Sequence, residues 1–279
     1  MILGGGESGV GAALLGKDKK YEVFLSDSGK IDKKYKDVLI HNGIEWEDGT
    51  HTESKILGAD LVVKSPGIPD KVSIVKKLRN TAISVVSEIE FAATFTSGNI
   101  IGITGSNGKT TTTMMVYHIL RQAGLDVAMG GNIGESFAKQ VINDTSNYVL
   151  ELSSFQLDGI QSFRPHIAVI TNITPDHLDR YDHKFENYID SKFRIVMNQT
   201  SKDYLLYDSD DEVITSYIKN HPIQSQLVPF SLSKVVANGA YLEQNNIIIE
   251  FNNRDTIMPT TNLALEGKHN VKNAMAAAT

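Results

Sequence analysis

Residues 100–110 read IIGITGSNGKT, and this stretch decides the fold. A short isoleucine-rich run, typical of a buried strand, leads into a glycine-bearing turn, and Gly108-Lys109-Thr110 then opens a helix. In this arrangement the backbone N–H groups of the loop and the positive end of the helix point at an anion. The stretch therefore predicts a phosphate-binding loop in an α/β fold.

The polar groups of this loop have separate predicted roles. Lys109 adds positive charge for the outer phosphates of a nucleotide, and the hydroxyl of Thr110 is a ligand for Mg²⁺. The loop departs from the general pattern, because Ile103 stands where that pattern has its first glycine. The alternative, a glycine- and serine-rich turn with an incidental lysine, leaves the strand–loop–helix order unexplained.

Other short apolar runs predict further buried strands, of the kind found in parallel sheets. They are residues 21–25, 61–63, 148–152 and 167–170. Helical patterns alternate with them, which indicates an α/β fold with a mostly parallel sheet. The clearest helix is expected over 109–123, with Met115, Ile119, Leu120 and Ala123 on its apolar face and Gly124 as its stop. Residues 239–251 predict a hairpin that turns at Asn245-Asn246.

The length of 279 residues suggests about two domains. Because Gly98-Asn99 separates a helical pattern from a fresh strand, we expect domains over residues 1–93 and 94–279. Both ends look abrupt: little precedes the first glycine loop, and the last helical pattern, from Val271, reaches Thr279 without a cap. We therefore expect the chain to be part of a longer protein.

Composition excludes several classes of protein. The formal net charge of −6 argues against a nucleic-acid-binding protein. The absence of cysteine excludes disulfides, thiol catalysis and cysteine-ligated zinc. No apolar run reaches the ~18–20 residues that span a bilayer, and the first residues, MILGGGESGVG, lack the features of a signal peptide. We expect no membrane insertion and a cytoplasmic location.

Two polar residues follow or interrupt predicted strands. Glu151 interrupts the apolar run 148–152, at the carboxyl end where α/β folds place ligands, so it could hold Mg²⁺ opposite Thr110. The alternative is a glutamate on the solvent face of an edge strand. His177 follows the strand 167–170 and has Asp176 beside it, so it is either a metal ligand or a solvated loop histidine. Lys192, taken alone, reads as a surface charge.

A second glycine loop lies at the start of the chain. Residues 4–9 read GGGESG, which satisfies G-x-G-x-x-G, and Asp27 lies 18 residues after Gly9. This pattern indicates either a phosphate-bearing ligand or a close-packed glycine turn. Residues 64–68, KSPGI, follow another strand and are expected to form a turn at the same edge, facing this loop.

Six segments together resemble the Mur ligase family. They are SPGI at 65–68, TGSNGKTT at 104–111, GGNIG at 130–134, ELSSFQL at 151–157, NITPDH at 172–177 and GKHNVKNA at 267–274. Segment 151–157 favours the D-glutamate-adding members. The resemblance implies a Rossmann-like N-terminal domain, a P-loop mononucleotide-binding α/β central domain and no C-terminal domain in this chain.

The resemblance also implies an activity. ATP would phosphorylate the carboxylate of UDP-N-acetylmuramoyl-L-alanine, and the amine of D-glutamate would attack the acyl phosphate, in a monomeric enzyme of peptidoglycan precursor synthesis. Two Mg²⁺ ions are implied, with a carbamate on Lys192, which stands 15 residues after His177. This chain alone is expected to bind the UDP-linked substrate and not to ligate by itself.

The resemblance assigns roles to particular residues. The residues assigned to catalysis are Lys109, Glu151, His177 and Lys192, and those assigned to metal binding are Thr110, Glu151, His177 and Lys192. The residues assigned to ATP binding are Gly105, Ser106, Asn107, Gly108, Lys109, Thr110, Thr111, Asn270 and Asn273, of which the last two would contact the adenine. The residues assigned to binding of the UDP-linked substrate are Gly6, Glu7, Ser8, Gly9, Asp27, Ser28, Ser65, Pro66, Gly67, Asn132, Ser153 and His177. Family members often carry a basic residue where this chain has Gly29, which affects the uracil side.

Three other functions stay open. One is another ATP-dependent acid–amino-acid ligase, either a different Mur ligase or an enzyme like folylpolyglutamate synthase. A second is a dinucleotide-binding module built on residues 4–9, which leaves the Lys109 loop unexplained. A third is a non-catalytic binding fragment.

Overall fold

The structure is a computed structural model that describes residues 1–251 and 254–279. It contains two compact units. The first comprises Met1–Gly98, Gly130–Thr145 and Phe155–Phe163, and the second comprises Asn99–Met129, Ser146–Ser154 and Arg164–Thr279. The predicted domain boundary between residues 93 and 94 stays a prediction.

The first unit holds a parallel sheet with the strand order β3-β2-β1-β4-β5. Its strands are β1 (Ile2–Leu3), β2 (Phe24–Asp27), β3 (Glu45–Asp48), β4 (Leu61–Lys64) and β5 (Ser84–Ser87). Its helices are α1 (Glu7–Asp18), α2 (Lys33–His41), α3 (Glu53–Leu57), α4 (Ser73–Arg79), α5 (Glu88–Ala93) and α7 (Phe137–Ile142). The strand order reverses between β1 and β4, and ligands of open α/β sheets bind at such a switch point. The glycine loop follows β1, and the turn from Ser65 follows β4.

One strand prediction in this unit is partly wrong. Residues 21–25 were expected to be extended, but β2 begins only at Phe24 and continues to Asp27. Tyr21 is 48% exposed and packs edge to face against Phe91 and Phe95. An aromatic contact with a helix therefore takes the place of strand pairing at this position.

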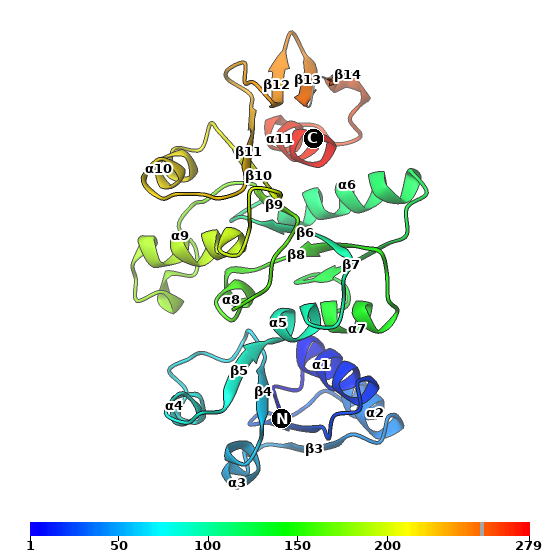
Figure 1. Ribbon diagram of the computed structural model, residues 1–279, viewed down its shortest axis with the longest axis vertical. Coiled ribbons are helices and arrows are strands. Elements are labelled where there is room, and N and C mark those ends of the chain that lie inside the picture. Colours follow the sequence, from blue (N-terminus) through cyan, green and yellow to red (C-terminus); the bar gives the residue numbers. More distant parts are fainter. Residues whose placement is uncertain (252–253) are drawn as a thin grey trace. The chain divides into compact units, whose positions relative to one another are not determined.

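The second unit is built on a sheet with the order β14-β13-β12-β11-β10-β9-β6-β8-β7. Its strands are β6 (Asn99–Thr104), β7 (Val127–Gly131, whose last two residues belong to the first unit), β8 (Asn147–Glu151), β9 (Ile167–Ile170), β10 (Tyr204–Asp208), β11 (Gln226–Ser231), β12 (Gly239–Glu243), β13 (Asn246–Phe251) and β14 (Arg254–Pro259). Its helices are α6 (Lys109–Gln122), α8 (Ser154–Leu157, which continues into the first unit), α9 (Phe185–Phe193), α10 (Glu212–Asn220) and α11 (Lys268–Ala278), with short 3-10 turns η1 (Leu178–Arg180), η2 (Arg194–Val196) and η3 (Thr260–Asn262). Helices α9 and α10 lie on one side of the central strands, and α6 and α11 lie on the other (Figure 1).

The α/β fold class and most of the predicted elements of the second unit are confirmed. The strands over 100–103, 148–152 and 167–170 are present as β6, β8 and β9, and the helix begins at Lys109 as predicted. Gly124 ends that helix with a φ of +78°. Buried aliphatic side chains, among them Ile103, Val149 and Val169, form the core between the sheet and its helices.

The predicted apolar face of α6 is partly wrong. Ile119 is 43% exposed, whereas Thr112, Thr113 and Val116 are buried. Helix α11 packs against α6, and Thr112 Oγ1 donates a hydrogen bond to Asn273 Oδ1 on α11. The buried face of α6 is therefore set by a helix that lies far along the chain, and not by the local apolar pattern.

The predicted hairpin is confirmed as β12 and β13, which pair antiparallel. Its turn lies one residue earlier than predicted, at Gln244 and Asn245, whose φ angles are +47° and +65°. A third antiparallel strand, β14, was not predicted and pairs with β13. In the described part of the chain, no helix is both long and apolar enough to cross a bilayer.

Candidate functional site

The phosphate loop follows β6, which lies between β9 and β8 in the sheet. Because these strands are parallel, their carboxyl ends meet at the loop. From the β8 side, Glu151 Oε2 accepts a hydrogen bond of 2.7 Å from Thr110 Oγ1. Glu151 is 2% exposed, and β8 has β7 on its other side, so the alternative of a solvent-facing glutamate on an edge strand is wrong.

Two glycines of the loop have no room for a side chain. Gly105 has a φ of +148°, and a Cβ there would lie 1.9 Å from Thr171 Oγ1. Gly108 has a φ of +81°, and a Cβ there would lie 2.5 Å from Asn273 Oδ1. The loop therefore needs glycine both for its backbone conformation and for its close packing.

The segment after β9 forms the other wall of the loop. Ser106 N–H donates to the Asn172 carbonyl and Asn107 N–H to Asn172 Oδ1, both at 2.9 Å. Thr171 Oγ1 donates to the Asn107 carbonyl at 2.6 Å, and Ser106 Oγ donates to the Thr174 carbonyl at 2.8 Å. Sequence reasoning gave no role to Thr171, Asn172 or Thr174. Their signal was the run of polar residues that directly follows a buried strand.

Two lysines converge on one backbone carbonyl of the loop. Lys109 Nζ donates to the carbonyls of Gly105 and Ser106, both at 2.9 Å, and Lys192 Nζ donates to that of Gly105 at 2.7 Å. Lys192 is 1% exposed and its ammonium lies 4.6 Å from the centroid of the Tyr188 ring, so the interpretation of Lys192 as a surface charge is wrong. Burial lowers the pKa of Lys109, and the charges of Glu151 and Asp176 partly oppose that shift.

His177 lies close in sequence to the wall formed by Thr171–Asp176, and its side chain is 55% exposed. Its backbone N–H donates to Asp176 Oδ1 at 2.9 Å, and its Nε2 lies 3.5 Å from Asp176 Oδ2. Within residues 1–251 and 254–279, no three His, Asp or Glu side chains stand together as a metal site. The assignment of His177 to metal and substrate stays a prediction.

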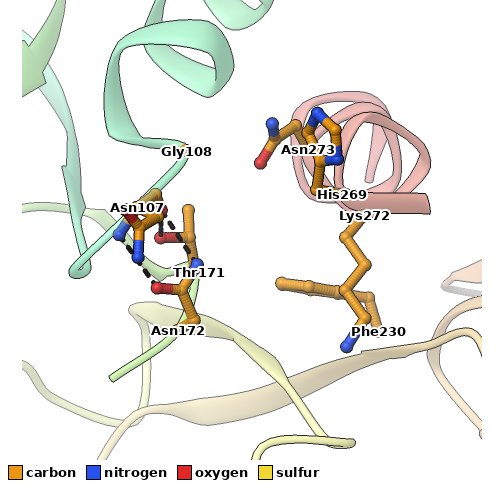
Figure 2. Close-up of a pocket in the computed structure, with 8 residues that line it drawn as sticks. All are labelled: Asn107, Gly108, Thr171, Asn172, Phe230, His269, Lys272 and Asn273. Carbon is orange, nitrogen blue, oxygen red and sulfur yellow. Dashed lines mark hydrogen bonds between the residues drawn. The ribbon is translucent and has the colours of Figure 1, made fainter. Parts of the chain in front are cut away.

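A pocket of about 160 Å³ lies between the loop and the start of α11 (Figure 2). Its lining residues are Asn107, Gly108, Thr171, Asn172, Phe230, His269, Lys272 and Asn273. Asn273 lines the pocket, whereas Asn270 is not among the lining residues and its Oδ1 accepts a hydrogen bond of 3.3 Å from Asn273 Nδ2. The assignment of both residues to adenine stays a prediction. Sequence reasoning missed Phe230, His269 and Lys272. The polar and flat groups of this pocket suit a nucleotide base.

Lys272 is held by two carboxylates beside the pocket. Its Nζ lies 2.6 Å from Asp208 Oδ2 and 3.3 Å from Asp210 Oδ2. Burial raises the pKa of Asp208, and donation from Lys272 partly offsets this. Asp210 has its pKa lowered to about 2 against the effect of burial, because Ser231, Ser233 and the Leu232 N–H all donate to it. Ser153 and Thr111 of the predicted set are partly buried in the same unit.

In the first unit, the loop over residues 4–9 is braced by a carboxylate. Asp27 Oδ2 accepts from the Gly5 N–H at 2.6 Å, and Asp27 Oδ1 accepts from the Gly29 N–H at 2.7 Å. Gly4 has a φ of +99°, and a Cβ there would lie 2.6 Å from Ser65 Oγ. The prediction that the KSPGI turn faces this loop is therefore confirmed.

The remaining predicted residues of this unit differ in their accessibility. Exposed positions are Gly6, Ser28, Gly67 and Asn132, and partly buried ones are Glu7, Ser8, Asp27, Ser65 and Pro66. Gly9 is buried, and a Cβ there would lie 1.9 Å from the Gly4 carbonyl oxygen. A Cβ on Gly6 would meet nothing within 4 Å, so the loop presents bare backbone at this one position.

The fold and the site define a class of protein: a phosphate-loop α/β protein with a lysine, a hydroxyl–carboxylate pair and a base-sized pocket around one loop. Residues 103–279 match the family model of the Mur ligase middle domain, and residues 2–74 match that of the MurD N-terminal domain. The chain belongs to the Mur ligase family.

Several relatives carry the same name. The chain is 61% identical over 278 residues to the UDP-N-acetylmuramoylalanine–D-glutamate ligase of Christiangramia forsetii, and 52% identical over 282 residues to that of Cytophaga hutchinsonii. Both alignments cover 99% of this chain and 62% of the relative, so the chain spans less than two thirds of the length of these relatives.

Solved structures share the fold at low sequence identity. The UDP-N-acetylmuramate:L-alanyl-γ-D-glutamyl-meso-diaminopimelate ligase of Neisseria meningitidis has a TM-score of 0.68 at 19% identity, covering 99% of this chain and 90% of that one. A UDP-N-acetylmuramate–alanine ligase of Thermotoga maritima has a TM-score of 0.57 at 22% identity, covering 99% and 63%. These likenesses confirm the predicted α/β architecture.

Proposed function

We propose that the whole protein is an ATP-dependent amide ligase that adds D-glutamate to UDP-N-acetylmuramoyl-L-alanine through an acyl phosphate. The observation that carries this proposal is the convergence of Lys109, the Thr110–Glu151 pair and buried Lys192 on one loop. The names of the relatives supply the substrates. We further propose that the enzyme is monomeric and cytoplasmic and forms ADP.

The donor set beside the loop suits Mg²⁺. Thr110 offers a hydroxyl and Glu151 a buried carboxylate, 2.7 Å apart, and Mg²⁺ takes oxygen ligands, commonly one or two carboxylates with phosphates and water. These two residues would hold a first ion, which would neutralise charge on the outer phosphates. A second ion, held by His177 and a carbamate on Lys192, rests on the family resemblance and on the burial of Lys192.

The proposed reaction needs no nucleophile from the protein itself. A γ-phosphate and a substrate carboxylate repel each other, so positive charge and oriented N–H groups must offset that repulsion. Lys109 and the loop backbone supply these groups, and fixing both reactants in line supplies much of the remaining acceleration. The segment Thr171–Thr174 keeps the loop in its conformation through the hydrogen bonds described above.

The first unit is the proposed site for the UDP moiety. The exposed backbone at Gly6 would approach the diphosphate, with Ser65, Pro66 and Gly67 beside it. The Gly29 N–H is taken by Asp27, so this chain has neither a basic side chain nor a free N–H at that position for uracil. A dinucleotide-binding module remains the rival function for this unit.

A panel of ligands tests the proposed function on this chain. We expect UDP-N-acetylmuramoyl-L-alanine and Mg·ATP to raise the melting temperature, because each binds only the folded state, whereas folates and NADH should leave it unchanged. Ligation, followed as D-glutamate-dependent ADP release, is expected to be absent from the chain alone. A shift by NADH without one by the UDP compound would favour the dinucleotide module, and ADP release would contradict the expected inactivity.

Two glycine variants of the first loop separate binding from stability. Gly6→Ala should leave the unfolding free energy unchanged, because its Cβ enters open space, and should weaken binding of the UDP compound by crowding the diphosphate. Gly9→Ala should lower the unfolding free energy by about 1–3 kcal/mol, because its Cβ would overlap the Gly4 carbonyl. Urea unfolding followed by fluorescence of the single tryptophan, Trp46, and calorimetric titration would measure both. The reverse pattern would contradict the assignment of the loop.

A further inference from the structure

Glu7 lies in the first glycine loop, but its carboxylate is engaged by a different segment of the same unit. Glu7 Oε1 accepts a hydrogen bond of 3.2 Å from the Ser136 N–H and lies 2.7 Å from Lys139 Nζ. Partial burial opposes ionisation, but donation from Lys139 and Ser136, with a smaller contribution from Tyr35, lowers the pKa of Glu7. The carboxylate is therefore an anion that ties the start of α1 to the start of α7.

The segment that Glu7 holds closes another loop, over residues 130–134, which contains Asn132. Gly131 N–H donates to the Glu135 carbonyl at 3.1 Å, and Gly131 has a φ of +102°. Gly130 lies against the same carbonyl, because a Cβ there would be 2.6 Å from that oxygen. The position of Glu135 and Ser136 thus sets the position of the Asn132 loop.

Close packing makes this connection stiff. A Cβ on Gly11 of α1 would lie 1.9 Å from Ser136 Oγ, so α1 and the start of α7 approach as closely as a glycine allows. Glu88, the first residue of α5, accepts the Ala138 N–H at 2.5 Å. Residues 136–139 are therefore fixed by two carboxylates and by a steric contact, and cannot shift without disturbing α1.

We propose that Glu7 is a positioning residue that couples the loop of residues 4–9 to the Asn132 loop, so that one ligand with a diphosphate and a distal acyl group engages both loops together. The inference rests on the proposed function of the first unit, in which the diphosphate meets Gly6 and the muramoyl peptide meets Asn132. Glu7 acts on the distal part of the ligand through Ser136 and Lys139, without contacting it.

Two ligands of different length test this coupling. In Lys139→Met, which removes the partner of Glu7, binding of UDP should stay within about two-fold of the unsubstituted chain, whereas binding of UDP-N-acetylmuramoyl-L-alanine should weaken about ten-fold, the scale of one charged hydrogen bond. Glu7→Gln should weaken binding of UDP-N-acetylmuramoyl-L-alanine to the same extent. The double variant should bind no more weakly than either single variant, because both remove the same contact. Asp37→Asn, at an exposed carboxylate of α2, is the matched control and should change neither affinity.

A second readout follows the geometry without any ligand. Hydrogen exchange at the Gly131 and Ser136 amides should accelerate in Glu7→Gln, while exchange within β1 and β4 stays unchanged. Equal weakening of both ligands, or no weakening of either, would overturn the coupling even with exchange altered. An unsubstituted chain that binds neither UDP compound would overturn the proposed function of this unit and the coupling with it.

Discussion

Lys109→Met should weaken the binding of Mg·ATP to this chain by roughly 10- to 150-fold, the equivalent of about 1.5–3 kcal/mol for a hydrogen bond to a charged group. The ammonium of Lys109 lies on the loop itself, against the carbonyls of Gly105 and Ser106. Burial lowers its pKa and so disfavours the charged form, and an incoming phosphate would reverse that effect by adding negative charge beside it. Methionine keeps most of the unbranched apolar stem and removes the charge.

Calorimetric titration with Mg·ATP measures the change, and two matched comparisons make it specific. Lys202→Met, at an exposed lysine of the same unit, should bind ATP as the unsubstituted chain does. Lys109→Met should leave the affinity of the first unit for UDP unaltered. If ATP binding were unchanged in Lys109→Met, the loop over residues 104–111 would not be the phosphate site.

The sequence was informative about the loop over residues 104–111 because the end of a buried strand can be recognised from a short stretch of sequence. Parallel strands bring their carboxyl ends to one edge, so Glu151 and His177, which lie at or beyond the ends of separate apolar runs, were predicted to face the loop after β6. In the structure Thr110 contacts Glu151 and Lys192 contacts the loop, whereas the assignment of these residues to metal and catalysis stays a prediction. The family resemblance was needed for Lys192, because nothing in its local sequence indicates burial.

Other parts of the site depend on contacts between distant segments and had no local signal. The pocket beside the loop needs α11, so Lys272 and His269 acquire their place only when α11 packs on α6. Ile119 was wrongly predicted to be buried, because the helical pattern of α6 does not show which face of the helix α11 covers. Asp27 was predicted to contact a ligand, and the structure shows both of its oxygens holding backbone N–H groups of the glycine loop and its neighbour.

Glu88 is another residue whose surroundings come from a distant segment and have no local sequence signal, and its replacement should change how stability depends on pH. It is fully buried where α5 meets α7, accepts one N–H from Ala138, and its Oε2 has no hydrogen-bond partner among the described residues. Burial, with a smaller contribution from the charge of Glu7, raises its pKa to about 7 against the donation from Ala138. The folded state thus keeps a proton that the unfolded state loses near its usual pKa of 4.5.

The difference between the folded-state and unfolded-state pKa of Glu88 makes the stability of the fold depend on pH. Between about pH 4.5 and pH 7 the folded state binds more protons than the unfolded state, so its stability falls as the pH rises and stays at the lower level above pH 7. The full loss is about 3 kcal/mol, of which about 2 kcal/mol lies between pH 5.5 and pH 8.5. Glu88→Gln keeps an acceptor for Ala138 and cannot ionise, so that part of the pH dependence should disappear.

Urea unfolding followed by Trp46 fluorescence reports on this unit, since Trp46 lies in β3. Glu90→Gln is the matched control, two residues along the same helix. Partial burial opposes ionisation of Glu90, but its oxygens accept from the N–H groups of Gln161, Ser162 and Phe163 and from the Ser162 hydroxyl, which lowers its pKa. Stability from Glu90 is therefore present above its unfolded pKa and lost in acid, so Glu90→Gln should be destabilising at pH 5.5 and at pH 8.5 alike. If Glu88→Gln kept the full pH dependence of the unsubstituted chain, Glu88 would ionise normally and the α5–α7 contact would have to admit water.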